Sequence, residues 1–119
     1  MTDESPPRVL LVEDEALIAM MIEDQLTQLG FEVVGPAATA SQAIALCEDC
    51  DIDGAVLDIN LGAGQRSDPI AEHLYEHGIP FVFVTGYGQA GVDERFADAS
   101  VLQKPFTLPQ LRQLLAEMF

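Results

Sequence analysis

The sequence has few basic residues, few cysteines and no long apolar run, and each shortage argues against a class of protein. Five of the 119 residues are Lys or Arg against twenty Asp and Glu, so the formal net charge is -15. A surface this acidic repels the phosphates of nucleic acids and of anionic membranes, and it favours cations and basic partners, although solubility alone also explains it. No stretch approaches the roughly 18 apolar residues of a membrane-spanning helix. The acidic residues 1–8 lack the apolar core of a secretion signal, so we expect a cytoplasmic protein with no nucleic-acid or membrane partner.

The two cysteines, Cys47 and Cys50, form a CxxC pair, a spacing that occurs in zinc sites and redox sites. A structural zinc site needs a second pair of ligands, which the sequence does not supply. A thioredoxin-like pair would open a helix after a strand, whereas this pair falls where a predicted helix ends. We therefore interpret both cysteines as structural.

Apolar residues make up 49% of the chain, enough for one domain with its own core. Short apolar runs alternate with helical patterns, which is typical of a parallel sheet with helices on both faces. A tail, residues 1–7, precedes the domain at residues 8–119. The predicted strands cover residues 8–13, 31–37, 54–59, 80–86 and 100–104. The predicted helices cover residues 14–30, 39–49, 67–78, 91–99 and 107–119, and the segment at 91–99 is expected to be short or mobile because it has few apolar anchors.

Several helix ends have recognisable signals. Gly30 suits the position just after a helix, where a left-handed backbone conformation is common. Asp68 is a candidate N-cap with Pro69 in the first helical position. Thr107 and Gln110 have the spacing of a capping box. These signals support the predicted boundaries.

The helix predicted at 14–30 has more apolar residues than one buried stripe can use. One stripe is formed by Ala19, Ile22, Leu26 and Leu29, which leaves Leu17, Ile18, Met20 and Met21 over. An apolar surplus on a surface helix marks either a docking site or a wider contact with the core, and the sequence leaves both open.

Polar residues stand where the apolar strands end. Glu13 and Asp14 end the first strand, Asp58 the third, Thr85 the fourth and Lys104 the fifth. In an open parallel sheet, the carboxyl ends of the strands form one crevice in which ligands bind. We therefore expect three acids, one hydroxyl and one amine to converge on one rim of the sheet.

Three carboxylates held close together repel one another and need a counter-charge. Oxygen ligands without His or Cys suit a hard cation, Mg²⁺ first. Lys104 supplies a point charge for a phosphate and Thr85 a hydroxyl donor, so the set suits phosphoryl transfer. A carboxylate can itself accept that group as an aspartyl phosphate. Asp58 is the candidate acceptor, with Glu13 and Asp14 as metal ligands.

Four motifs, LLVEDE, VLDINLG, FVFVTG and LQKPF, occur in this order, and together they resemble the CheY-like receiver domain of two-component response regulators over essentially the whole chain. The resemblance implies a flavodoxin-like α/β fold, a doubly wound five-stranded parallel sheet of order 2-1-3-4-5. It also implies that Asp58 is phosphorylated by a histidine kinase or phosphotransfer protein in a Mg²⁺-dependent reaction and is slowly autodephosphorylated. The implied Mg²⁺ ligands are Asp14 and Asp58 directly, Glu13 through water, and the backbone carbonyl of Asn60.

The same resemblance assigns further roles. Thr85 and Lys104 would contact the phosphoryl group, and the Lys104–Pro105 peptide bond is often cis in this family. The loop that follows Lys104 lies beside the first helix in receivers and contacts the kinase. The expected docking surface consists of Ile18, Met21, Pro105 and Phe106.

Residues 83–87, FVTGY, resemble the signature of the "FAT GUY" receivers, which are often single-domain regulators. We therefore expect a stand-alone receiver, monomeric or dimeric on phosphorylation, that signals through a downstream protein partner. Val101 stands where most receivers carry an aromatic residue that swings inward on activation. Our hypothesis is that Tyr87 signals instead, and the alternative is that Tyr87 shields the site.

Two other functions remain open from the sequence. A haloacid-dehalogenase-type aspartyl-phosphate hydrolase also begins from an Asp at a strand end, but it needs a second acid where this chain has Asn60, so we expect no turnover of free substrates. A pseudo-receiver would bind partners without phosphorylation, which the full set of acids, Thr and Lys argues against. His73 and His77 lie four apart but lack the HExxH pattern, so we interpret them as part of a solvated helix face.

Overall fold

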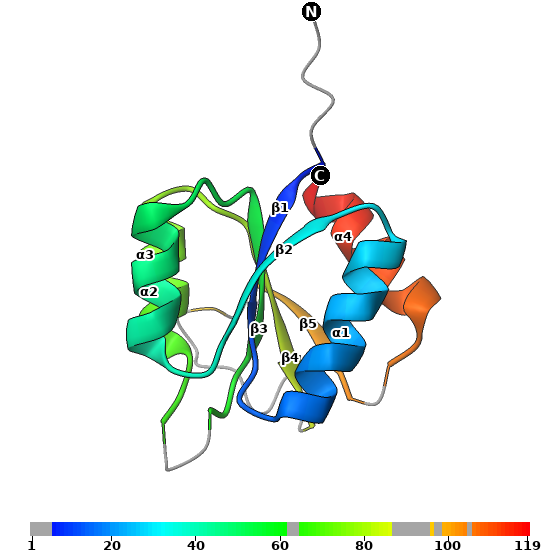
Figure 1. Ribbon diagram of the computed structural model, residues 1–119, viewed down its shortest axis with the longest axis horizontal. Helices are drawn as coiled ribbons and strands as arrows, with labels where there is room; N and C mark the ends of the chain where they lie inside the picture. The colour runs from blue at the N-terminus through cyan, green and yellow to red at the C-terminus, as the bar shows by residue number, and fades with distance from the viewer. Residues whose placement is uncertain (1–5, 62–64, 87–95, 97–98, 105) are drawn as a thin grey trace, which may run out of the picture.

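Five parallel strands form one sheet in the order β2-β1-β3-β4-β5 (Figure 1). The computed structural model describes residues 6–61, 65–86, 96, 99–104 and 106–119. This order confirms the predicted doubly wound sheet. The strands are β1 (Arg8–Val12), β2 (Glu32–Ala37), β3 (Gly54–Asp58), β4 (Phe81–Thr85) and β5 (Ser100–Gln103).

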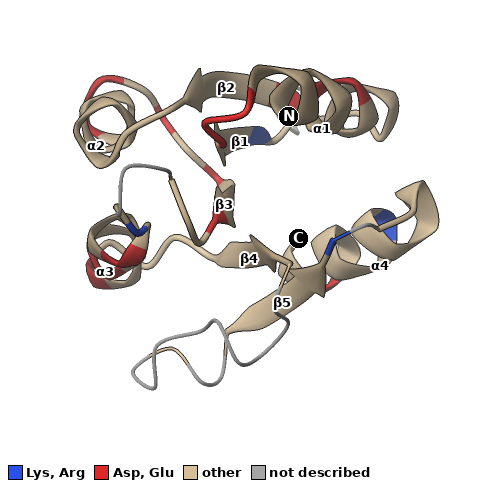
Figure 2. Cartoon of the chain, turned by 90° about the horizontal axis from the view of Figure 1, so that it is seen from below, with Lys and Arg blue, Asp and Glu red and all other residues tan. Residues whose placement is uncertain are grey.

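The helices of the described residues cover both faces of the sheet (Figure 2). They are α1 (Ala16–Gln28), α2 (Ala40–Asp49), α3 (Asp68–Glu76) and α4 (Leu108–Met118). Helices α1 and α4 lie on one face, and α2 and α3 lie on the other, as the alternating pattern predicts. Most of the helix predicted at 91–99 falls outside the described residues. Within the described ranges, none of the helices combines the length and the apolar character needed to cross a bilayer.

The central strands are apolar throughout because both of their faces are buried. In β1, Val9 and Leu11 pack toward α1 and α4, whereas Leu10 and Val12 pack toward α2 and α3. Successive side chains of a strand point to opposite faces, so one short run of sequence contributes to both halves of the core. The polar residues that follow these strands are therefore held at one edge of a rigid sheet.

The end of α1 has the predicted glycine. Gly30 has a φ of +93°, and its N–H donates to the carbonyl of Thr27 at 3.0 Å. The N–H of Phe31 donates to the carbonyl of Leu26 at 3.0 Å, which completes a Schellman motif. The predicted capping box at the start of α4 is also present, with Thr107 and Gln110 bonding each other's backbone N–H.

The predicted N-cap of α3 is wrong by one residue. The helix begins at Asp68, so Ser67 is the N-cap and Pro69 is the second helical residue. A hydrogen bond to the residue that follows β3 holds Ser67 in place, because its N–H donates to the carbonyl of Ile59 at 2.9 Å. Its carbonyl accepts from Ile70 at 2.9 Å and so opens the helix. A backbone contact with the end of β3 therefore decides where the helix starts.

Phe96 is an apolar anchor in the segment after β4, which was expected to have few of them. Its side chain is 8% exposed and belongs to the core on the α2 and α3 side. Its ring contacts Phe81 and Phe83 edge-on, with centroids 6.0 and 5.9 Å away. The Phe96 side chain therefore packs against β4.

Candidate functional site

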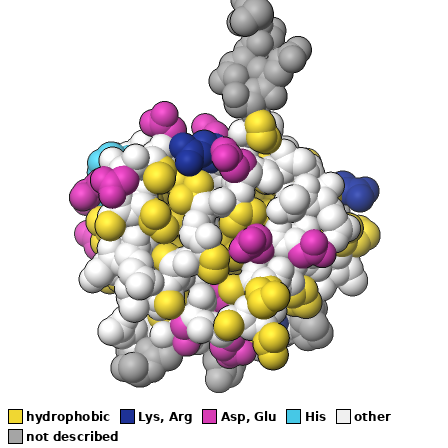
Figure 3. Space-filling model, in the orientation of Figure 1, with side chains coloured by type: hydrophobic (Ala, Val, Ile, Leu, Met, Phe, Trp, Pro, Cys, Tyr) yellow, Lys and Arg dark blue, Asp and Glu magenta, His cyan; other side chains and the backbone are white. Residues whose placement is uncertain are grey.

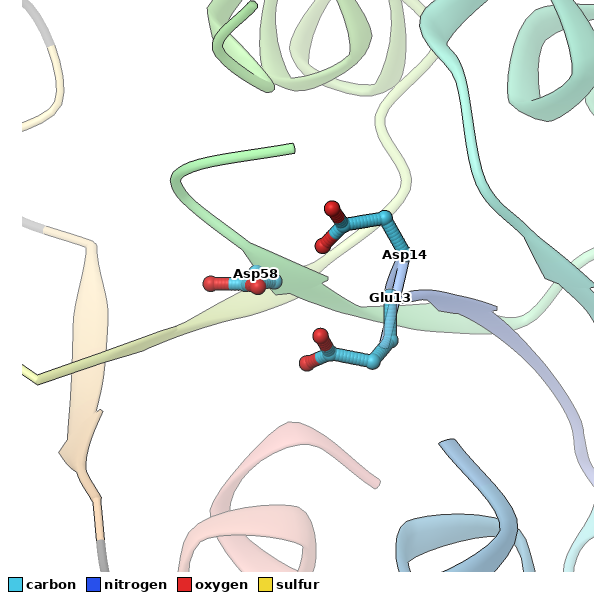
Figure 4. Close-up of side chains that lie close together, drawn as sticks. All are labelled: Glu13, Asp14 and Asp58. Carbon is cyan, nitrogen blue, oxygen red and sulfur yellow. The ribbon is translucent and has the colours of Figure 1, made fainter. Parts of the chain in front are cut away.

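Three carboxylates from two neighbouring strand ends converge at the carboxyl edge of the sheet (Figure 4). Glu13 and Asp14 follow β1, and Asp58 is the last residue of β3. One oxygen atom from each side chain lies within 4.8 Å of the other two. Glu13 and Asp58 are buried, whereas Asp14 is exposed. The three acids therefore meet as the strand-end rule predicts.

Backbone hydrogen bonds hold these carboxylates in place. The N–H of Glu13 donates to the carbonyl of Ala37 in β2 at 3.0 Å. Asp58 is in register with Val84, and the N–H of Ile59 donates to the Val84 carbonyl at 3.2 Å. Two of the acids thus extend from a main chain that is fixed on its neighbouring strands.

Lys104 brings a positive charge to the two buried acids. Its Nζ lies 3.2 Å from Oε2 of Glu13 and 3.5 Å from Oδ2 of Asp58. Its backbone N–H donates to the carbonyl of Thr85 at 2.8 Å, which ties the end of β5 to the end of β4. Thr85 itself is buried. The predicted acids, hydroxyl and amine therefore lie on one rim of the sheet.

Burial disfavours the charged form of the Glu13 and Asp58 carboxyl groups. Burial, followed by the charge of Asp58, raises the pKa of Glu13 from 4.5 to about 6. Burial also raises the pKa of Asp58, and neither Lys104 nor the N–H of Asn60, which donates to the Asp58 carboxylate, fully offsets it. Burial acts to lower the pKa of Lys104, but the charges of Asp58 and Glu13 outweigh it and the pKa is raised. One ammonium group therefore does not compensate the buried acids.

This set of ligand atoms fits a small hard cation. All of its donors are carboxylate oxygens, with no His or Cys among them, and two of the acids carry raised pKa values that a cation would relieve. Asn60 is exposed two residues after the end of β3 and forms an isolated antiparallel bridge with Arg66. Its backbone is therefore at the same edge of the sheet as the acids.

The apolar surplus of α1 divides in two, because Leu17, Met20 and Met21 are exposed, whereas Ile18 is half-buried and packs against the core on the α1 and α4 side. Ala19, Ile22 and Leu26 are buried against the sheet, while Leu17 is 82% and Met20 is 65% exposed. This excludes the wider core contact as the explanation for those two side chains. Figure 3 shows apolar side chains gathered over α1 among acidic ones.

The residues expected to dock the kinase lie together. Ile18, Met21 and Phe106 line one hollow of about 360 Å³ with Lys104. The hollow therefore joins the apolar side of α1 to the amine that contacts Asp58. Pro105, and with it the expected cis bond, lies outside the described residues.

Of the two residues of the expected switch, Val101 and Tyr87, the described part of the chain contains Val101. Val101 is half-buried in β5, in register with Phe83, and packs on the core of the α2 and α3 side. Tyr87 lies outside the described residues. An aliphatic side chain thus occupies the position where most receivers would place an aromatic one.

Residues 9–116 match the family model of the response regulator receiver domain, and the chain belongs to this family. PdtaR, a transcriptional regulatory protein of Mycobacterium tuberculosis, is 34% identical over 109 residues, which cover 89% of this chain and 53% of PdtaR. The phyllosphere-induced regulator PhyR of Methylorubrum extorquens is 34% identical over 82% of this chain and 38% of PhyR. The chain thus spans about half the length of PdtaR and less than half the length of PhyR.

A solved receiver is similar over nearly its full length. The solution structure of SdrG from Sphingomonas melonis Fr1 superposes with a TM-score of 0.86 and is 47% identical, covering 98% of each chain. A BeF3-activated conformation of SdrG superposes with a TM-score of 0.80 and 48% identity over 96% of this chain and 97% of that one. Both similarities confirm the receiver fold.

Proposed function

We propose that this receiver accepts a phosphoryl group on Asp58 from a histidine kinase or phosphotransfer protein, in a reaction that requires Mg²⁺. The observation that carries the proposal is the convergence of Glu13, Asp14 and Asp58 beside Lys104. A carboxylate oxygen of Asp58 would attack phosphorus as the bond from phosphorus to the donor's imidazole nitrogen breaks. The electron pair of that bond returns to the imidazole, and an acyl phosphate forms on Asp58.

The proposed ion ligands are the side chains of Glu13, Asp14 and Asp58 and the backbone carbonyl of Asn60. When bound, Mg²⁺ would neutralise charge on the transferring phosphoryl oxygens. Glu13 is the most buried of the three acids, so its role would be to add charge behind the ion, with water between them. Asp14 is open to solvent and would reach the ion directly.

Lys104 would contact the phosphoryl group. Its ammonium already lies 3.5 Å from Asp58, so a short movement away from Glu13 brings it to an oxygen of the bound phosphoryl group. The Thr85 hydroxyl, at the end of the adjacent strand, would donate to another oxygen. The added charge would then change the surface around β4 and β5.

The signal would pass to a downstream protein, with Tyr87 and Val101 as the proposed switch. SdrG has been described in a BeF3-activated conformation, which supports a change of conformation on phosphorylation in a close relative. The PhyR protein of Bartonella quintana is described as an anti-anti-sigma factor, which supports a protein as the target of such a receiver. The kinase would dock on Ile18, Met21, Pro105 and Phe106.

The test is phosphorylation of the purified chain by acetyl phosphate with Mg²⁺, followed by intact-mass spectrometry. We expect the mass of one phosphoryl group, lost in acid, and no addition in EDTA. Asp58→Asn should abolish the addition, while Asp51→Asn, the same change at an exposed residue, should leave it intact. A phosphorylated Asp58→Asn protein would refute the assignment of the acceptor.

The same protein tests the hydrolase alternative. Incubation with a phosphate monoester and Mg²⁺ should give no turnover, because Asn60 stands where that class needs an acid. Sustained release of inorganic phosphate would instead support a haloacid-dehalogenase-type hydrolase. A chain that gains no phosphoryl group from acetyl phosphate or a kinase would support a pseudo-receiver.

A further inference from the structure

Two histidines near the end of α3 lie on one side of the helix. His73 is in the last turn and His77 follows the helix directly, one helical turn further along the chain. Their rings are stacked, with centroids 4.3 Å apart and planes 30° apart. His73 is half-buried and His77 is exposed, so solvent reaches the pair. The sequence spacing alone did not show that the two rings face each other.

A hydrogen bond sets the state of one ring. Nδ1 of His77 lies 2.7 Å from the backbone carbonyl oxygen of His73. A carbonyl oxygen only accepts hydrogen bonds, so Nδ1 must carry the hydrogen. In the neutral imidazole the lone pair is then on Nε2. Histidines that bind metals commonly have this arrangement, with one nitrogen donating to a carbonyl and the other bound to the ion.

The spacing of the rings suits a shared ion. A tetrahedral Zn²⁺ with bonds of about 2.0–2.1 Å holds two nitrogen ligands about 3.3 Å apart. The ring centroids are 4.3 Å apart, and because a nitrogen lone pair lies in its ring plane, binding one ion requires the His73 ring to turn out of the stack toward Nε2 of His77. Glu72 and Glu76 precede the two histidines in the sequence, and the negative charge of the chain raises the local concentration of cations.

We propose that His73 and His77 form a two-histidine site for a borderline divalent cation, with Zn²⁺ as its first candidate. Among the described residues, a grouping of three or more potential ligands occurs at Glu13, Asp14 and Asp58, so water would complete the coordination at the histidines. The two sites differ in chemistry, because imidazole nitrogen favours Zn²⁺ and carboxylate oxygen favours Mg²⁺. A bound ion would join the last turn of α3 to the residue that ends it. The proposal does not depend on phosphorylation of Asp58.

The test is isothermal titration of the full chain with ZnCl₂ in excess Mg²⁺, which occupies the carboxylates. We expect one Zn²⁺ per chain. His73→Gln and His77→Gln should each lower the affinity at least about ten-fold. Asp58→Asn controls for binding at the acids, and Cys47→Ser with Cys50→Ser controls for binding at the cysteines; both should leave the affinity unchanged.

An NMR measurement identifies the site independently. Amide signals around His73 and His77 should shift on addition of Zn²⁺ in the wild-type chain, and not in His77→Gln. Unchanged affinity in both histidine variants would overturn the proposal, as would loss of binding in the cysteine variant alone. Absence of heat and of amide shifts in the wild-type chain would overturn it as well.

Discussion

Replacement of Glu13 by Gln should stabilise the protein when no metal is present. Glu13 is 3% exposed, and the pKa of its carboxyl is raised from 4.5 to about 6 by burial and by Asp58. A raised pKa means that the folded chain binds this proton more tightly than the unfolded chain does. The contribution of Glu13 to the free energy of unfolding therefore falls as the pH rises from about 4.5 to about 6, and then stays level.

The size of the effect follows from the shift. One pKa unit corresponds to 1.36 kcal/mol, so the shift of Glu13 costs up to about 2 kcal/mol above pH 6. Gln is neutral and nearly the same shape, and its single carbonyl oxygen can replace one of the two Glu13 oxygens, accepting either from Lys104 Nζ or from the N–H of Glu15. The variant should be more stable than the wild type by up to about 2 kcal/mol near pH 7 and similar to it near pH 4.

Urea unfolding in EDTA, repeated from about pH 4 to about pH 7, measures this difference. The matched control is Glu117→Gln, the same charge change at an exposed position of α4, which should alter stability by less than about 0.5 kcal/mol. Addition of Mg²⁺ should stabilise the wild type more than Glu13→Gln. A Glu13→Gln chain that is less stable than the wild type near pH 7 in EDTA would contradict the assigned charge repulsion.

Three further substitutions test other parts of the molecule. Gly54→Ala should destabilise by about 1 kcal/mol, because its Cβ would lie 2.6 Å from Cζ of Phe119, a half-exposed terminal ring that must shift, and Phe119→Ala in the same chain should recover part of the loss in thermal melts. Met21→Glu should slow phosphotransfer from the cognate kinase about ten-fold without changing the rate with acetyl phosphate, whereas Gln28→Glu should change neither; an equal loss with both donors would argue against docking. Tyr87→Ala should leave phosphorylation intact and abolish the difference in partner binding between the two states in a pull-down, and retained discrimination would rule out Tyr87 as the switch.

The sheet could be predicted because buried parallel strands leave apolar runs in the sequence, with turns and helical patterns between them. The start of α3 could not be located to the residue. Asp68 and Pro69 have the local pattern of a helix start, but the hydrogen bond from Ser67 to Ile59 decides the position. Phe96 was missed as an anchor for a similar reason, since only the folded chain brings Phe81 and Phe83 to its ring.

The candidate site could be located because residues at the carboxyl ends of parallel strands must lie at one edge. That rule places Glu13, Asp58 and Lys104 together without any coordinates. The raised pKa of Glu13 could not be predicted in the same way, because it depends on burial by neighbouring elements. The side-chain hydrogen bond of His77 was likewise beyond the sequence, which fixes the spacing of two histidines but not the orientation of their rings.

A titration with Mg²⁺ followed by NMR tests the proposed ion site most directly. The amide signals of Glu13, Asp14, Asp58 and Asn60 should shift together and saturate at one ion per chain. Asp14→Asn should weaken the binding, and Asp51→Asn should not. Shifts that are confined to other acidic residues, or an affinity that Asp14→Asn and Asp58→Asn leave unchanged, would show that these carboxylates do not hold the ion.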